Sequence, residues 1–369
     1  AAHMSTSSFK IAHKLLTGAG AIEQLAFELT RLDVDNPLIV TDAALVKSGT
    51  VALALEHLGE RTYEIFDRVL PDPEIAIVED CMRVYREGGH DGLIGVGGGS
   101  AIDIAKSVAA YAGYHGALAD LFGVDQVPRK GPPLIAIPTT AGTGSEVTNV
   151  AILSDKAAQL KKGIVSDYLL PDVALISPQM TLTCPRSVTA ASGVDALVHA
   201  IESYLSLNAS PITDALAIGA IKLIAQALPK AYANPANLQA RDDMATASLM
   251  AGMAFGNAGV GAVHALAYPL GGRFNIAHGV SNALLLPYVM HWNKLACVER
   301  MQEISPAISV NITGLSVNDA ADQAVEAMPR LCAALALPAG LLSIRVPDAA
   351  IPPLPVDPAG IDLPVPHTP

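Results

Sequence analysis

The chain has 369 residues, of which 51% are hydrophobic and 4% are aromatic, and its net charge is -12. This length allows two domains, and the apolar content is sufficient for large aliphatic cores and for a surface that joins subunits of a homodimer or higher homo-oligomer. An acidic chain without a basic face is not expected to bind nucleic acid. The expected partner is therefore a small molecule.

The cysteine pattern and the most apolar run favour a cytoplasmic protein over a membrane or secreted one. Four cysteines are scattered without a C-x-x-C spacing, as is typical of reduced thiols. Residues 93–113 form the most apolar run, but Asp103, Lys106 and a glycine cluster interrupt it. We expect this run to fold as a buried strand, a turn and a helix.

Strand and helix patterns alternate over the first half of the chain. Short aliphatic runs bounded by proline, glycine or charged residues predict strands at residues 37–42, 61–66, 92–96 and 134–137. Helical periods lie before and between them, at residues 21–30, 43–58, 74–87 and 101–111. This alternation predicts a Rossmann-like α/β domain over residues 5–180, with a parallel sheet and helices on both of its faces.

The pattern changes after Pro185, where strand signals end and long Ala- and Leu-rich helical periods begin. Helices are predicted near residues 186–206, 211–232, 238–257, 260–270, 279–294 and 316–336. These periods predict an all-helical domain over residues 181–345. The last segment, residues 346–369, contains eight prolines and is expected to be a loop or an extended arm.

A glycine cluster joins the predicted strand at 92–96 to the helix that follows it. Gly97, Gly98 and Gly99 precede Ser100, so exposed amides and the helix dipole can attract an anion there. Without Cβ atoms, the main chain can approach a pyrophosphate closely. The cluster does not match G-x-G-x-x-G, and simple turn geometry is the alternative interpretation.

Polar side chains follow two of the other predicted strands. Asp42 can accept a hydrogen bond from a ribose hydroxyl, which would favour NAD over NADP, or it can cap the following helix. Thr139, Thr140 and Thr143 provide hydroxyls at the carboxyl end of the strand at 134–137. Open α/β sheets bind ligands at that edge.

Four side chains in the helical half have the composition of a metal site. Asp195 and His199 are four residues apart, so one helix places them on one face. His264 and His278 lie in later apolar segments. Three imidazoles and a carboxylate suit Fe(II) or Zn(II) better than Mg(II). The alternative is that each histidine is a hydrogen-bonded core residue.

Together these motifs resemble the iron-containing, or group III, alcohol dehydrogenase family. The resemblance covers roughly residues 10–335 and rests on the segments 97–106, 138–148, 195–199 and 264–279. It implies a dehydroquinate synthase-like architecture, with a cofactor cleft between an α/β domain and a helical metal domain. The implied activity is metal-dependent hydride transfer between NAD(H) and a small alcohol, diol or aldehyde.

The resemblance also implies a role for individual residues. The metal ligands would be Asp195, His199, His264 and His278, with Fe(II) as the expected ion and Zn(II) as the alternative. Gly98, Gly99 and Ser100 would hold the pyrophosphate of the cofactor, and Asp42 its adenine ribose. The rest of the cofactor groove would be lined by Asp103, Thr139, Thr140, Thr143 and Lys161.

The chain departs from the family pattern in two places. Tyr268 stands where many members have a second histidine, one helical turn after His264. Its phenol could relay a proton, so Tyr268 and the ligand His278 are the catalytic candidates. The proline-rich segment 346–369 stands where the family usually has a charged helix, which affects the edge of the cleft.

Three other functions are compatible with parts of the pattern. Maleylacetate reductases resemble this fold but work without a metal, and the four intact ligand positions argue against that activity. A hydroxyacid-oxoacid transhydrogenase would swap hydride between two organic acids on a retained cofactor. A non-catalytic dinucleotide-binding protein would be expected to have lost at least one of the ligands.

Overall fold

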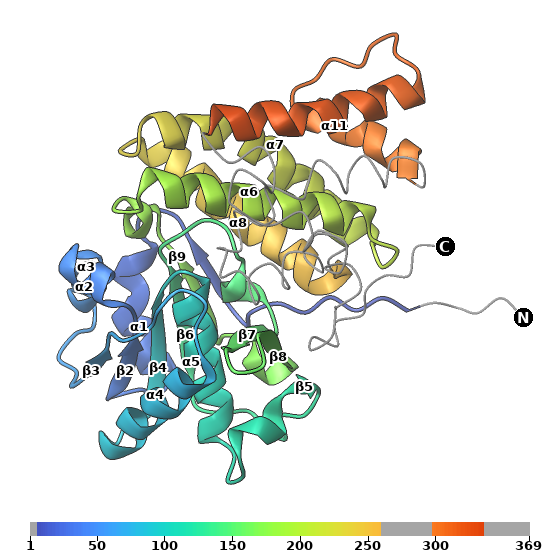
Figure 1. The fold of residues 1–369 in the computed structure, drawn as a ribbon. Helices are drawn as coiled ribbons and strands as arrows, with labels where there is room; N and C mark the ends of the chain where they lie inside the picture. The colour runs from blue at the N-terminus through green and yellow to red at the C-terminus, as the bar shows by residue number, and fades with distance from the viewer. Residues whose placement is uncertain (1–5, 260–296, 336–369) are drawn as a thin grey trace, which may run out of the picture.

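The computed structural model describes residues 6–259 and 297–335, which form an α/β region and a helical region (Figure 1). The α/β region contains a six-stranded sheet in the order β1-β9-β6-β4-β2-β3, and every neighbouring pair is parallel. The strands are β1 (Leu15–Thr17), β2 (Pro37–Val40), β3 (Glu64–Phe66), β4 (Gly92–Gly97), β6 (Leu134–Pro138) and β9 (Val173–Ile176). The predicted parallel sheet is confirmed.

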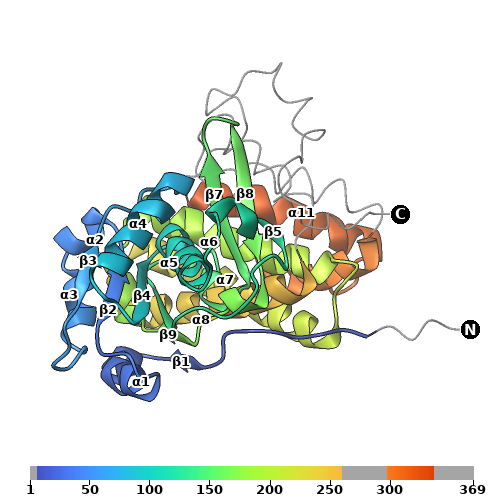
Figure 2. The same cartoon turned by 90° about the horizontal axis from the view of Figure 1, so that it is seen from below.

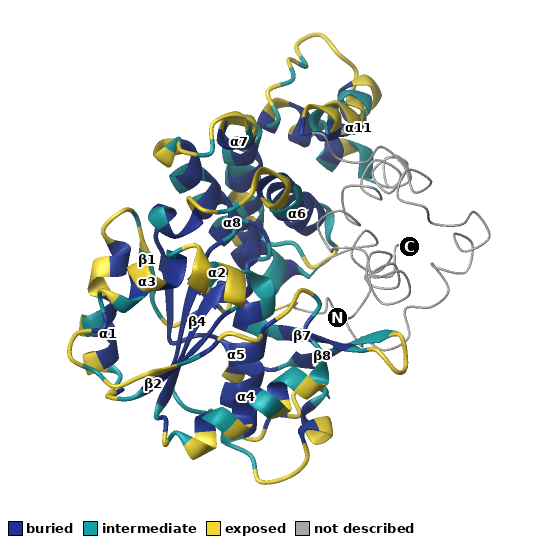
Figure 3. Cartoon of the chain, turned by 60° about the vertical axis from the view of Figure 1, so that its left-hand side comes forward, coloured by how far each residue is buried: buried dark blue, intermediate teal, exposed yellow. Residues whose placement is uncertain are grey.

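Helices cover both faces of this sheet because the side chains of its central strands alternate between two cores. Leu38 and Leu93 join the core under α4 (Ile75–Glu87) and α5 (Gly99–Ala112). Ile39 and Ile94, the next residue in each strand, join the opposite core. That core is completed by η1 (Ala21–Gln24), α1 (Leu25–Arg31) and α3 (Thr50–Leu55). Figure 3 shows the strands as the buried layer between these helices.

Two predicted elements of this region differ from the structure. The single helix predicted at residues 43–58 is two helices, α2 (Ala43–Lys47) and α3. The break falls at Gly49, whose φ of 84° is left-handed and cannot continue a right-handed helix. The strand predicted from residue 61 begins at Glu64, because Arg61 instead donates hydrogen bonds to the Val34 and Leu58 carbonyls.

A second, smaller sheet lies beside α5 (Figure 2). It contains β5 (Gly123–Val124), β8 (Leu160–Val165) and β7 (Val150–Asp155), and β7 and β8 form an antiparallel hairpin. This sheet builds one wall of the site described below.

The helical region contains α6 (Arg186–Leu205), α7 (Pro211–Ala233), α8 (Leu238–Ala258), a helix at 297–307 and α11 (Val317–Ala334). The predicted helices at 260–270 and 279–294, and the segment 346–369, lie outside the described residues. By length and composition α7 is apolar enough to cross a membrane. It packs against α6 and α8, and its buried residues belong to the core of this region.

The order of the strands creates a switch point between β2 and β4. From β2 the chain adds β3 on one side, whereas β4, β6 and β9 extend the sheet on the other side. Ligands of open α/β sheets bind at the carboxyl ends of the strands that flank such a point. Here those ends are followed by Asp42 and by the glycine cluster at 97–99.

The loop that follows β6 joins the two regions by backbone contacts that only glycine permits. A Cβ at Gly142 would lie 2.6 Å from the Ser192 carbonyl oxygen of α6. A Cβ at Gly144, where φ is +69°, would lie 2.6 Å from Gly252 Cα of α8. The loop is therefore held against both helices, and its position relative to them is set by main-chain packing.

Candidate active site between the two regions

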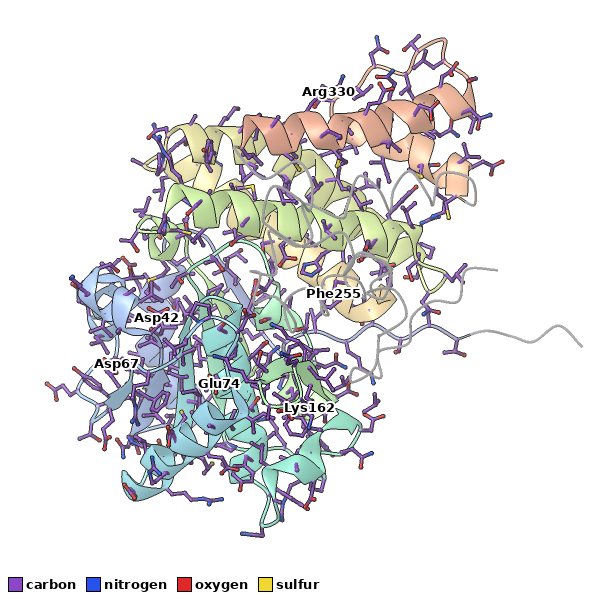
Figure 4. The ribbon with its side chains drawn as sticks, viewed as in Figure 1. Asp42, Asp67, Glu74, Lys162, Phe255 and Arg330 are labelled. Atoms are coloured by element: carbon purple, nitrogen blue, oxygen red, sulfur yellow. The ribbon has the colours of Figure 1, made fainter. Side chains whose placement is uncertain are left out.

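The predicted ligands Asp195 and His199 lie on one face of α6, buried at 2% and 3% exposure. Asp195 Oδ1 is 3.8 Å from His199 Nε2. The His199 ring stacks on Phe255 of α8, with 4.6 Å between the ring centroids and 21° between their planes. Phe255 lies where the helical region meets the α/β region (Figure 4). The stacking restrains the plane of the imidazole ring.

This pair has the spacing of two ligands that share an ion. Oxygen and nitrogen ligands lie about 2.0–2.2 Å from Fe- or Zn-type ions, so two of them can be at most about 4.4 Å apart. The 3.8 Å between Asp195 Oδ1 and His199 Nε2 falls within this limit. The described residues contain no group of three potential ligands. His264, His278 and Tyr268 lie outside the described residues, so their placement stays a prediction.

One cleft brings the two described metal candidates, Asp195 and His199, together with most of the cofactor candidates. The volume of this cleft is about 680 Å³ when the open solvent at its mouth is included. The predicted site residues on its lining are Gly99, Ser100, Asp103, Thr143, Lys161, Asp195 and His199. The first three come from the amino-terminal part of α5 and the last two from α6, so the cleft spans both regions.

The glycine cluster packs against the loop that follows β6. A Cβ at Gly97 would lie 2.7 Å from Ala101 Cβ, and a Cβ at Gly99 would lie 2.7 Å from Thr143 Cγ2. Glycine is therefore needed for this close approach. It places the amino-terminal amides of α5, a helix of 14 residues, at the cleft. Helix amino termini favour anions.

Four of the predicted cofactor residues are not among the residues that line this cleft. They are Asp42, Gly98, Thr139 and Thr140. Asp42 caps α2, because its Oδ1 accepts a 2.8 Å hydrogen bond from the Leu45 amide. The Thr139 amide donates to the Gly97 carbonyl at 2.9 Å, and Gly98 packs on the Thr140 side chain. These residues shape the strand ends, and their contact with a cofactor stays a prediction.

A buried lysine fastens the loop after β6 to α5. Lys106 is fully buried, and its Nζ donates to the Thr148 carbonyl at 2.8 Å, to Thr148 Oγ1 at 3.1 Å and to the Val150 carbonyl at 3.1 Å. Burial lowers the pKa of Lys106 to about 8 and raises the pKa of Glu146 to about 7. The attraction of the two charges offsets only part of this cost.

Asp103 lies one turn along α5 from the glycine cluster. Its Oδ2 accepts a 3.1 Å hydrogen bond from the Ile152 amide of β7, whereas its buried Oδ1 has no hydrogen-bond partner among the described residues. Burial raises the pKa of Asp103 to about 6, although Lys106 lowers it. An acceptor in this position fits a ligand that brings a donor into the cleft.

Two residues of the site were missed at the level of sequence. Phe255 stacks on His199, and Asp72, in the loop after β3, forms an ion pair with Lys161. The sequence around Phe255 gives no sign of a role in the site, because an isolated aromatic residue in a helical period is typical of a core position. Asp72 did have such a sign, because Pro71 and Pro73 flank it in a turn that follows a strand, as Asp42 also follows a strand.

Comparison with known proteins agrees with this geometry. Residues 12–178 match the model of iron-containing alcohol dehydrogenases, and residues 189–355 match the model of the carboxyl-terminal part of the same family. The chain belongs to the iron-containing alcohol dehydrogenase family. The predicted oxidoreductase class, fold and family are thereby confirmed.

Individual members of the family are similar over most of their length. Long-chain-alcohol dehydrogenase 1 of Geobacillus thermodenitrificans is 47% identical over 339 residues, which cover 90% of this chain and 85% of that protein. The NAD-dependent methanol dehydrogenase of Bacillus methanolicus is 36% identical over 347 residues, 94% of this chain and 91% of that protein. A crystal structure of 1,3-propanediol oxidoreductase has a TM-score of 0.93 and 39% identity, and the match covers 97% of this chain and 95% of that one.

Proposed function

We propose that this iron-containing alcohol dehydrogenase transfers a hydride between NAD(H) and a small alcohol, diol or aldehyde. The observation that carries the proposal is the shared cleft. It is lined by the amino terminus of α5, where an anion is favoured, and by Asp195 and His199 of α6. In this proposal, the dinucleotide groove and the metal-ligand pair would face one cavity.

Most of the residues proposed to bind the cofactor lie in α5 and in the loop after β6. Amides at Gly98, Gly99 and Ser100 would bind the pyrophosphate, and Asp42 would accept from the adenine ribose, which favours NAD over NADP. Further polar contacts would come from Asp103, Thr139, Thr140, Thr143 and Lys161. The nicotinamide, when bound, supplies the hydride acceptor or donor.

The metal assignment starts from the Asp195 and His199 pair. Together with His264 and His278 these residues would bind Fe(II), or Zn(II) as the alternative. Such an ion, when bound, supplies Lewis acidity that makes a substrate hydroxyl easier to deprotonate. Phe255 covers one face of the His199 ring and shields it from water on that side.

The substrate class, the assembly and the location of the protein are further parts of the proposal. Relatives are named for methanol, 1,3-propanediol and long-chain alcohols, which supports a primary alcohol or its aldehyde as the substrate class. The acidic net charge of -12 supports a small-molecule partner and not a nucleic acid. We propose a cytoplasmic homodimer or higher homo-oligomer.

The test is metal analysis of protein purified without chelator, combined with an NAD(H) assay on a panel of alcohols and aldehydes. His199→Ala is expected to lose bound metal and activity together, because it removes one of the two predicted ligands that the structure describes. His115→Ala, on the exposed surface, is the matched control and is expected to keep both. Full activity in a metal-free His199→Ala variant would contradict the Lewis-acid role.

The same assay separates the alternative activity. A hydroxyacid-oxoacid transhydrogenase would turn over two organic substrates without added cofactor. Turnover that depends on free NAD(H) supports a dehydrogenase, and turnover without it supports the transhydrogenase.

A further inference from the structure

The wall of the cleft that faces α5 is built from two segments distant in sequence. One is the loop after β3, which contributes Asp72 and Pro73, and the other is the β7–β8 hairpin, which contributes Lys161. The Lys161 ammonium forms an ion pair with the Asp72 carboxylate, and the two side chains are only 9% and 18% exposed. Both residues of this pair are in the lining of the cleft.

The main chain of the wall is held in place independently of this ion pair. The Ser154 amide of β7 donates to the Pro73 carbonyl at 2.8 Å, and the backbones of Glu74 and Ser154 pair as an isolated parallel β-bridge. A second ion pair joins Glu74 Oε1 to Lys156 Nζ at 2.8 Å, with side chains 39% and 64% exposed. Glu74 is labelled in Figure 4 on the loop before α4. Removal of the Asp72 carboxylate is therefore expected to leave the backbone of the wall in place.

The backbone at Asp72 is constrained. Its φ of 50° is in the left-handed region, which aspartate tolerates better than most residues, and prolines precede and follow it. A carboxylate on such a backbone is a fixed anchor for a flexible lysine.

The charges of the cleft show what this anchor can do. Lys161 is the one lysine or arginine among the described lining residues, which also include the carboxylates of Asp72, Asp103 and Asp195. A dinucleotide brings a negatively charged pyrophosphate into this acidic cleft. A lysine already held at the wall binds such a ligand without first losing its conformational freedom.

We propose that Asp72 is a positioning residue for the cofactor, which acts by holding the Lys161 ammonium at the wall of the cleft. This inference rests on the proposed NAD(H)-dependent function and adds a residue to it. Asp72 neutralises part of the Lys161 charge, so the proposal requires that the ordering of the ammonium outweighs that loss. The effect concerns binding of the cofactor and not the hydride-transfer step.

The test compares Asp72→Asn with Glu74→Gln, which removes an ion pair from the same loop outside the cleft. NADH affinity is measured by nicotinamide fluorescence, and KM for NAD and kcat are measured at saturating alcohol. Asp72→Asn is expected to weaken NADH binding about three- to tenfold, because one side chain must now be ordered on binding. Its kcat at saturating cofactor is expected to stay within about twofold of wild type, and Asp72→Glu to recover part of the affinity. Glu74→Gln is expected to match wild type in both quantities.

A double-mutant cycle with Lys161→Met shows whether Asp72 acts through the lysine. In the Lys161→Met background, Asp72→Asn is expected to have little further effect on NADH affinity. Equal losses in both backgrounds, or NADH binding by Asp72→Asn as tight as wild type or tighter, would overturn the inference. Failure of the wild-type protein to bind NADH would instead refute the proposed function, and the inference with it.

Discussion

The glycine contact between α8 and the loop after β6 gives a test of the domain packing. An added Cβ at Gly252 would lie 2.8 Å from Gly144 Cα, 2.9 Å from Val147 Cγ2 and 3.1 Å from the Gly144 carbonyl oxygen. Two of these three neighbours are backbone atoms, so a change of rotamer cannot relieve the clash. Gly256, one turn further along α8, has ordinary contacts, with Thr148 Cγ2 3.5 Å away.

The magnitude follows from two opposing effects. Alanine in a helix interior is about 1 kcal/mol more favourable than glycine, which benefits both Gly252→Ala and Gly256→Ala. Overpacking against a close-packed neighbour costs about 1–3 kcal/mol and applies only to Gly252→Ala. The helix term cancels in the comparison, so Gly252→Ala is expected to be less stable than Gly256→Ala by about 1–3 kcal/mol.

The assay is urea unfolding of both variants and wild type, followed by circular dichroism at equal protein concentration. The difference is read from the transition midpoints at a common m-value. Gly252→Ala is also expected to weaken NADH binding. The loop that it would displace contains Thr143, which lines the proposed cofactor cleft. Equal stability of Gly252→Ala and Gly256→Ala would refute the close backbone contact between α8 and this loop.

Two further predictions concern single carboxylates. Glu146→Gln is expected to gain free energy of unfolding relative to wild type as pH rises from 5 to 8, because the pKa of Glu146 is raised from 4.5 to about 7. A raised carboxyl pKa gives stability that is present below pH 4.5 and lost as pH rises through 7, so a pH-independent difference between the two proteins would disprove burial of the ionised group. Asp42→Asn is expected to keep an N-cap that accepts from the Leu45 amide. Asp42→Ala is expected to lower the free energy of unfolding by about 1 kcal/mol, because it removes that cap. Thermal melts of both variants measure this difference. Both are expected to reduce the preference for NAD over NADP in steady-state assays, and an unchanged preference in Asp42→Asn would leave Asp42 as a helix cap only.

Local patterns in the sequence predicted most of the elements because each depends on the spacing of neighbouring residues. Aliphatic runs between breakers marked β2, β4 and β6, and helical periods marked α6, α7 and α8 to within about two residues. The same local rule placed Asp195 and His199 on one face, since residues four apart share a face of any α-helix. The left-handed turn at Gly49 was missed because helical periodicity continues across it.

The tertiary structure decided which of these elements meet. Nothing in the local pattern near Asp72 or Lys161 indicates that they pair, since 89 residues separate them. The same holds for Phe255 and His199, which belong to different helices. Periodicity reports which face of an element is apolar, but the partner of that face depends on how the whole chain packs. Glycines in the loop after β6 let its backbone approach α6 and α8 closely, and that contact is a property of the folded chain.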